Sequence, residues 1–373
     1  MPSDWDKIVG QQRVKQTLQS AVHHGRLAHA YLFWGSSGVG KDALAIEFAK
    51  TLLCIRQGDT ACGVCPSCKK MESLQHPNVK LIFPMPGGES EKSEDAEPLD
   101  TAVFEEVRKQ IGEKAANPYF RIDIPKAKFI LIRSIREIKK ESSMSSAERG
   151  KKIFIIFEAD AMNDPAANSL LKVLEEPLEN VHFILVSSRK DALKQTIISR
   201  CQLVQCSMLA DDEIADALIA RGAAERPQAE LVSRLANGSF TRALELLGTD
   251  TTRYRTDAVQ FLRSMLGSSS MKFFEEQEEY LSGNKRDNAE QLLTMLLAWF
   301  RDTIVVRENS TGNILNIDQE TDLRNFVRNF GAKNLEACLS SVERALGLLR
   351  RNVYLPLVML SLTVHLRRIL HAK

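Results

Sequence analysis

The chain has 373 residues, of which 44% are hydrophobic and 26% are charged, and its formal net charge is +2. This is the composition of an ordinary globular protein, and the length allows two or three domains with hydrophobic cores. The small net charge excludes a strong overall field, so any contact with nucleic acid must come from local basic patches. The sequence opens without the pattern of a secretory signal, and its apolar runs are too short to cross a bilayer, so we expect a cytoplasmic protein.

Residues 6–25 have the apolar spacing of a helix, and the run Ala30-Tyr31-Leu32-Phe33 that follows predicts a strand. Residues 35–42 then read G-S-S-G-V-G-K-D and lead into a further apolar run that predicts a helix. A glycine-rich loop between a strand and a helix is the context in which G-x-x-x-x-G-K predicts a phosphate-binding loop. Backbone N–H groups of this loop could hold phosphate, and Lys41 adds a positive charge.

The eighth position of the loop departs from the usual pattern. It normally carries Ser or Thr, whose hydroxyl binds Mg²⁺, but here it is Asp42. A carboxylate about 5 Å from a phosphate charge costs about 3 kcal/mol at an effective dielectric constant near 20, unless a metal bridges the two. The loop could therefore bind nucleotide weakly, or serve only as a tight turn, and the sequence leaves both open. The predicted phosphate-binding residues are Gly35, Gly38, Gly40, Lys41 and Asp42.

Four of the seven cysteines, Cys54, Cys62, Cys65 and Cys68, lie close together with the spacing C-x7-C-x2-C-x2-C. In a reducing compartment this spacing favours a metal site over a disulfide pair or free thiols. Four thiolates suit a closed tetrahedral Zn²⁺ site with a structural role. We interpret the three other cysteines as buried thiols.

A strand is predicted at residues 79–83, and the segment after it, up to about residue 100, is rich in turn formers and carboxylates. We expect a solvated loop there, followed by a helix over residues 101–116. Residues 132–140 repeat isoleucine at every third position, which predicts an amphipathic helix. The basic face of that helix could be merely solvated or could contact DNA phosphates. Its candidate contacts are Arg133, Arg136 and Lys140.

The apolar runs at residues 153–157 and 182–188 are typical of strands buried on both faces of a parallel sheet. The helix between them is predicted to have Asp164 at its N-cap and to end near Pro177. Strands that alternate with helices predict an α/β domain with a parallel sheet.

The patterns after this α/β domain are almost entirely helical. We therefore predict three domains: an α/β P-loop domain at 1–207 with the cysteine insert at 54–68, a small helical lid domain at 208–249, and a helical domain at 250–373.

Hydrolysis by a P-loop protein needs an acidic residue at a strand end to hold the Mg²⁺ shell and a neighbouring Glu to activate water. At this position the chain has Phe157-Glu158, and phenylalanine cannot bind a metal. Ser199-Arg200-Cys201 follows the last buried strand. Arg200 could be an ordinary surface residue, or it could reach the nucleotide of another subunit.

Several stretches together resemble the bacterial clamp-loader subunits of DNA polymerase III, which belong to the AAA+ class. They are residues 9–12, 29–33, the loop at 35–42, the four-cysteine insert, residues 167–177 and residues 199–201. The resemblance covers about the first 250 residues and implies the AAA+ fold. The helical remainder is similar in type to the collar domain through which these subunits associate.

This family contains ATP-hydrolysing motor subunits of the gamma or tau type and the delta-prime type, a rigid stator. A motor should have Ser or Thr in place of Asp42, Asp in place of Phe157 and Arg in place of Thr241, although Arg242 lies one residue away. Because all three differ while Arg200 is kept, the chain looks like the delta-prime type. The alternatives are a motor that uses Asp42 as a Mg²⁺ ligand, and a stand-alone zinc-dependent module that binds nucleic acid.

The resemblance implies a role in replication. The chain would join motor subunits and the delta subunit in a five-membered ring that loads the sliding clamp on primer–template DNA. It would have no ATPase of its own, and Arg200 would act in trans at a neighbouring motor's ATP. The family's DNA path runs along helices of the α/β domain, so Arg133, Arg136 and Lys140 are candidate phosphate contacts on equal terms with a merely solvated face.

Overall fold

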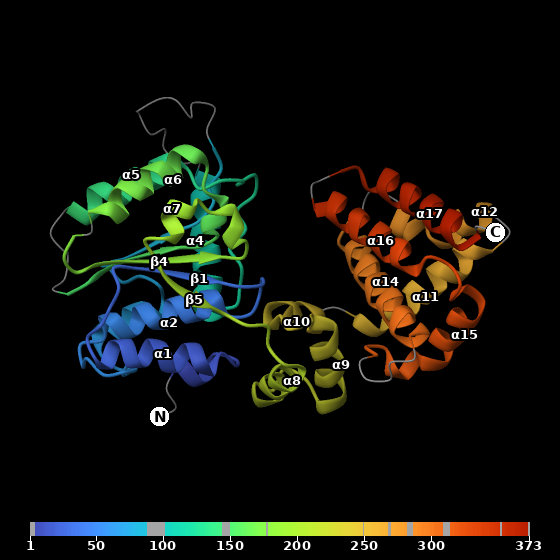
Figure 1. Ribbon diagram of the computed structural model, residues 1–373, viewed down its shortest axis with the longest axis horizontal. Coiled ribbons are helices and arrows are strands. Elements are labelled where there is room, and N and C mark those ends of the chain that lie inside the picture. Colours follow the sequence, from blue (N-terminus) through green and yellow to red (C-terminus); the bar gives the residue numbers. More distant parts are fainter. Residues whose placement is uncertain are drawn as a thin grey trace. The chain divides into compact units, whose positions relative to one another are not determined.

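The computed structural model describes residues 4–87, 101–143, 150–176, 178–248, 250–267, 270–281, 286–308, 314–350 and 353–371. The chain forms two compact units (Figure 1). The first comprises Met1–Gly222 and Ala236–Leu244, and the second comprises Ala223–Leu235 and Glu245–Lys373. The three-domain division at residues 207 and 249 remains a prediction.

The first unit is built on a five-stranded sheet of order β2-β3-β4-β1-β5, in which all the neighbouring strands are parallel. The α/β fold class of the P-loop domain is thereby confirmed. The strands are β1 (Ala30–Trp34), β2 (Val79–Ile82), β3 (Lys152–Ile156), β4 (Val181–Ser187) and β5 (Gln202–Gln205). Four of them are the predicted ones, whereas β5 is a largely exposed edge strand without an apolar pattern.

Helices cover both faces of this sheet (Figure 1). Alternate side chains of β1 point to opposite faces, as the two-residue period of a strand requires. Tyr31 and Phe33 pack against Phe48 of α2, with ring centroids 5.0 and 6.2 Å away. Leu32 belongs to the core on the other face, beneath α5 and α6. The helices of this unit are α1 (Gln12–His23), α2 (Lys41–Leu53), α3 (Pro66–Glu72), α4 (Thr101–Ala116), α5 (Ile132–Ser143), α6 (Asp164–Glu175), α7 (Gln195–Ile198) and α8 (Asp211–Ala220).

The N-cap of α6 is Asn163, and the prediction of Asp164 at this position was wrong. The Asn163 side chain accepts a hydrogen bond from the backbone N–H of Ala166 at 3.0 Å. Asp164 lies instead in the first turn, where its charge interacts favourably with the helix dipole. Both residue types cap helices well, so the local pattern could not separate the two neighbours.

The second unit is helical throughout its described residues, as the sequence predicts. The buried carboxylate of Asp302 on α14 accepts hydrogen bonds from the backbone N–H groups of Leu315 and Asn316 and so fixes the segment that follows residue 313. Its helices include α9 (Arg226–Ala236), α11 (Thr251–Leu266), α12 (Ser270–Glu276), α13 (Glu278–Leu281), α14 (Arg286–Arg307), α15 (Glu320–Phe330), α16 (Leu335–Arg350) and α17 (Leu355–His371); α10 (Phe240–Leu247) spans the boundary of the units.

Of the predicted acidic loop, residues 88–100 lie outside the described residues. Among the described helices, none is long and apolar enough to span a bilayer.

Candidate functional site

The predicted phosphate-binding loop connects β1 to α2, with Gly40 as the N-cap of that helix. Gly38 and Gly40 have φ values of +77° and +97°, in the left-handed region that favours glycine. A Cβ atom at Gly38 would lie 2.0 Å from the Ser239 hydroxyl, and one at Gly35 would lie 2.2 Å from the Cys206 carbonyl oxygen. The glycines are therefore needed both for the backbone conformation and for close packing.

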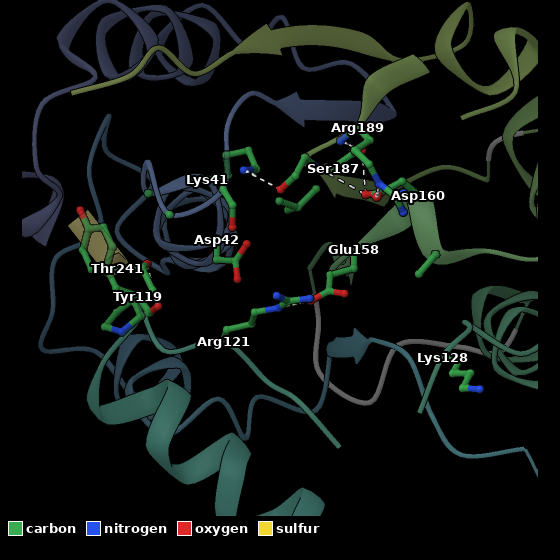
Figure 2. A pocket seen from close by; sticks show the side chains of 17 residues that line it. Lys41, Asp42, Tyr119, Arg121, Lys128, Glu158, Asp160, Ser187, Arg189 and Thr241 are labelled. Atoms are coloured by element: carbon green, nitrogen blue, oxygen red, sulfur yellow. Dashed lines mark hydrogen bonds and ion pairs between the residues drawn. The ribbon is translucent and has the colours of Figure 1, made fainter. Parts of the chain in front are cut away.

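A cavity of about 380 Å³ opens beside this loop (Figure 2). It brings together the loop, the ends of β3 and β4, and the segment that follows α4. Its walls carry the cationic side chains Lys41, Arg121, Lys128 and Arg189 and the carboxylates Asp42, Glu158 and Asp160.

The side chain of Lys41 points back toward the loop that it follows. Its ammonium donates hydrogen bonds to the carbonyl oxygens of Gly35 at 3.0 Å and Ser36 at 2.6 Å, and to the Ser188 hydroxyl at 3.1 Å. These three bonds use all the protons of the ammonium group. The side chain is buried, and burial lowers the pKa of Lys41. The lysine expected to bind phosphate is thus fully engaged by the protein.

Asp42 has an ion-pair partner that the sequence did not reveal. The ammonium of Lys114, at the end of α4, lies 2.5 Å from the Asp42 carboxylate. Lys114 also donates to the carbonyl oxygen of Phe120 at 2.6 Å, and its nitrogen lies 5.0 Å from the centroid of the Phe157 ring. The two positions expected to hold Mg²⁺ therefore contact one buried lysine.

The other two carboxylates of the cavity are also paired, as Figure 2 shows. Glu158, the residue in the place of the water-activating Glu, accepts a hydrogen bond of 2.7 Å from Arg121. Asp160 accepts hydrogen bonds from the Ser187 hydroxyl and from Arg189, both at 2.9 Å.

Thr241 and Tyr119 close another side of the loop. The Thr241 hydroxyl donates to the Tyr119 carbonyl at 3.1 Å, and its backbone N–H donates to the Gly38 carbonyl at 3.2 Å. The Tyr119 ring lies 3.3 Å from where a Cβ of Gly40 would be, and its hydroxyl accepts from the backbone N–H of Val9 at 2.8 Å. Thr241 lines the cavity, but Arg242 is not among the lining residues that the structure describes.

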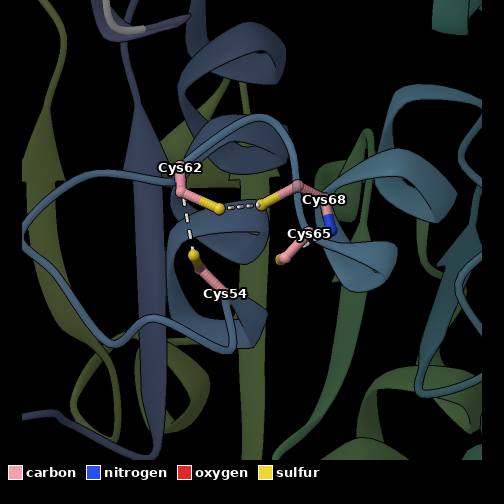
Figure 3. A group of neighbouring side chains, drawn as sticks. All are labelled: Cys54, Cys62, Cys65 and Cys68. Carbon is pink, nitrogen blue, oxygen red and sulfur yellow. Dashed lines mark hydrogen bonds between the residues drawn. The ribbon is translucent and has the colours of Figure 1, made fainter.

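The four clustered cysteines meet at the C-terminal end of α2 (Figure 3). Their sulfur atoms all lie within 4.8 Å of one another, which allows the group to hold a metal ion. Sulfurs around a tetrahedral Zn²⁺ would be about 3.8 Å apart, given Zn–S bonds of about 2.3 Å. A backbone N–H at Val64 lowers the pKa of Cys62 to about 6, whereas burial raises the pKa of Cys68.

Arg200 follows α7 and is not among the described residues that line the cavity, and its side chain is 34% exposed. Its guanidinium donates to the carbonyl oxygen of Thr196 and to the carboxylate of Glu175, both at 2.9 Å. Glu175 is itself half exposed. The arginine is therefore held at the surface by a backbone carbonyl and by a carboxylate that water also reaches.

The basic side chains of α5 are not equivalent. Arg136 and Lys140 are exposed, as predicted for phosphate contacts. Arg133 is half-buried and donates to the carbonyl oxygen of Pro86 at 3.3 Å, so it is less accessible than the sequence suggested.

Comparison with known proteins assigns the family. The family described as DNA polymerase III, delta subunit, matches residues 10–210, and its C-terminal family, described as DNA polymerase III, delta subunit, C terminal, matches residues 273–368. The chain belongs to this family. The predicted resemblance to DNA polymerase III clamp-loader subunits is confirmed at this level.

Individual DNA polymerase III subunits are similar over much of the chain. The DNA polymerase III subunit delta' of Bacillus subtilis strain 168 is 29% identical, over 80% of this chain and 78% of that protein. The delta' subunit of Haemophilus influenzae is 26% identical, over 63% of this chain and 58% of its own length. The tau subunit of Escherichia coli K12 is 28% identical, over 72% of this chain and 36% of its own length. The matches thus span less than two thirds of the latter two proteins.

Lys114, Arg121 and Tyr119 are the residues of this delta-family site that sequence reasoning missed. Lys114 lies 72 positions from Asp42, and Arg121 lies 37 positions from Glu158. Only the folded chain brings these partners together. The unusual acidic residue at position 42 was the one available signal, because a partly buried carboxylate is stabilised by a cationic partner or a metal.

Proposed function

We propose that this chain is a delta-prime-type stator of the DNA polymerase III clamp loader. It would help to load the sliding clamp on primer–template DNA without hydrolysing ATP itself. The observation that carries the proposal is that the charged side chains beside the loop are already paired within the protein. Lys41 is bonded to its own loop, Phe157 replaces a metal ligand, and Glu158 is paired with Arg121.

These contacts oppose phosphoryl transfer at the loop itself. Stabilising the transferred phosphate needs a free cationic side chain and a metal ion, and the attacking water needs an available base or orienting group. Lys41 would have to leave two backbone carbonyls to reach a phosphate. Glu158 would have to leave Arg121 to accept a proton. Hydrolysis would therefore begin by breaking contacts that stabilise the resting site.

Arg200 is proposed to act on a neighbouring motor subunit. An exposed ion pair contributes only about 0–1 kcal/mol, so the guanidinium can exchange Glu175 for a phosphate at little cost. Arginine suits this role because its planar group binds phosphate oxygens in a bidentate manner. A surface arginine held by a solvent-accessible ion pair, in a chain whose own site is self-paired, supports a role in trans.

Association with the motor and delta subunits is proposed to use the C-terminal helix. Leu357, Leu360 and Val364 of α17 are 60%, 42% and 56% exposed. Their spacing of three and four positions puts them on one face of the helix. An apolar stripe of this kind is typical of a protein interface. The stripe supports a collar formed by the second unit.

Two further proposals concern DNA and zinc. Arg136 and Lys140 would contact the phosphate backbone of primer–template DNA inside the ring, since both are exposed on α5. Cys54, Cys62, Cys65 and Cys68 would hold one Zn²⁺. With four thiolate ligands the metal would have no open position, so its role would be structural.

The isolated chain should show no steady-state ATPase activity above background, because its cavity lacks a metal ligand at Phe157 and a free base at Glu158. Phosphate release with MgATP is the measurement, and Lys41→Ala is the control. Robust turnover that disappears in Lys41→Ala would instead identify a motor subunit.

Arg200→Ala should lower the ATPase of a reconstituted complex with motor and delta subunits. Loss of an arginine finger reduces turnover at the affected site by about 10³-fold or more. Arg324→Ala is a matched control, because Arg324 is also a half-exposed arginine paired with one carboxylate. Equal rates for wild type and Arg200→Ala would remove Arg200 from the mechanism.

Metal analysis of the purified protein should find about one Zn²⁺ per chain. Cys68→Ser should lose most of the metal, because three thiolates no longer close the tetrahedron, whereas Cys201→Ser should keep it. Metal-free wild-type protein, purified without chelator, would contradict the zinc proposal.

Arg136→Ala and Lys140→Ala should each weaken binding of primer–template DNA by the assembled complex and reduce the salt slope of log K by about 1. Arg133→Ala should have a smaller effect, because Arg133 is tied to Pro86. Lys69→Ala, at an exposed lysine directly after the cysteine insert, is the control. Unchanged salt slopes for both α5 variants would place the DNA path elsewhere.

A further inference from the structure

The position of a divalent cation in a P-loop site is defined by two residues. The cation lies between the eighth residue of the loop and the acidic residue at the end of a neighbouring strand. In this chain these residues are Asp42 and Phe157. The ammonium of Lys114 contacts both, at 2.5 Å from the carboxylate and 5.0 Å from the ring centroid.

The surroundings of Lys114 show a built site for an ammonium group. Its side chain is 1% exposed, and it has a carboxylate, the Phe120 carbonyl and an aromatic face as partners. A buried charge needs such compensation. Phenylalanine, which cannot bind a metal, can stabilise an ammonium through the negative face of its ring. Asp42 and Phe157, the two departures from the P-loop pattern, are thus explained together. Both stabilise the ammonium of Lys114, whereas the usual residues at these positions bind Mg²⁺.

The residues of this loop therefore do not fit a magnesium nucleotide. We propose that the ammonium of Lys114 permanently occupies the place of the divalent cation, and that the site is closed to Mg²⁺. Any nucleotide that binds the loop binds without metal. The negative charge of Asp42 is neutralised from inside the chain, so no external cation is needed there.

The engagement of Lys41 agrees with this closure. A bound phosphate would have to compete with the carbonyl oxygens of Gly35 and Ser36 for the same ammonium protons. With Lys114 committed to Asp42, neither lysine is available to phosphate. Nucleotide binding is therefore weak, and Mg²⁺ cannot strengthen it.

The inference deepens the proposed stator role, but its test uses the isolated full-length chain and does not involve Arg200. Binding of ATP and ADP is measured by titration calorimetry in excess Mg²⁺ and in EDTA. Mn²⁺ binding without nucleotide is followed by electron paramagnetic resonance. Three proteins are compared: wild type, the rebuilt variant Asp42→Thr/Lys114→Met/Phe157→Asp, and Lys109→Met. Lys109 is an exposed lysine on the same helix, paired with Glu113, and serves as the control.

Wild type and Lys109→Met should show nucleotide affinities that differ by less than about twofold between Mg²⁺ and EDTA, or no binding in either. The rebuilt variant should bind Mn²⁺ and should bind nucleotide at least about tenfold more tightly with Mg²⁺. A tenfold gain from Mg²⁺ in the wild type would overturn the proposal, and this arm does not depend on the folding of any variant. A rebuilt variant with a wild-type melting temperature but no Mg²⁺ dependence would overturn it as well.

Discussion

The ion pair between Lys114 and Asp42 is the contact on which the architecture of the cavity depends. It joins the end of α4 to the first turn of α2, two elements that are far apart in the sequence. Lys114 is buried, so removing Asp42 would destabilise the fold, because the buried ammonium would lose its charge partner. The pair therefore holds the segment after α4, with Tyr119 and Arg121, against the loop. The rest of the cavity wall follows from that attachment.

The charged groups of the first unit differ in how strongly they are held, and this difference parallels the proposed division of labour. Lys114 is fully buried, so breaking its contact with Asp42 would leave a buried charge without compensation. Arg200 and Glu175 are both accessible to water, which screens their attraction. The ammonium of Lys114 beside the loop is held by buried contacts, whereas the guanidinium of Arg200 at the surface can change partners. This arrangement fits the proposed stator, in which Arg200 would act on a neighbour's nucleotide.

The sequence predicted the features that depend on local patterns. The four apolar strands, the loop at 35–42, the cysteine cluster and the amphipathic helix containing Ile135 and Ile138 all carry their signal within a few residues. It could not predict β5, because an exposed edge strand has no apolar alternation. Nor could it predict the partners of Asp42 and Glu158, since those contacts form only after the sheet has assembled. The predicted repulsion between the Asp42 carboxylate and a bound phosphate did not take into account the charge of Lys114, which lies next to Asp42.

Helix α2 connects the phosphate-binding loop to the cysteine cluster. Its N-terminus carries Lys41 and Asp42, both bonded within the protein, and its C-cap is Cys54 of the cysteine cluster. Twelve of its thirteen residues are buried, and Thr51 near its end accepts a hydrogen bond from Trp5 at 3.1 Å. In a motor subunit the N-terminus of this helix must respond to nucleotide. Here both ends are held by contacts that do not involve nucleotide, which fits the proposed stator role. Rigidity in the proposed stator is thus a consequence of side-chain pairing at the loop and does not require any change of fold.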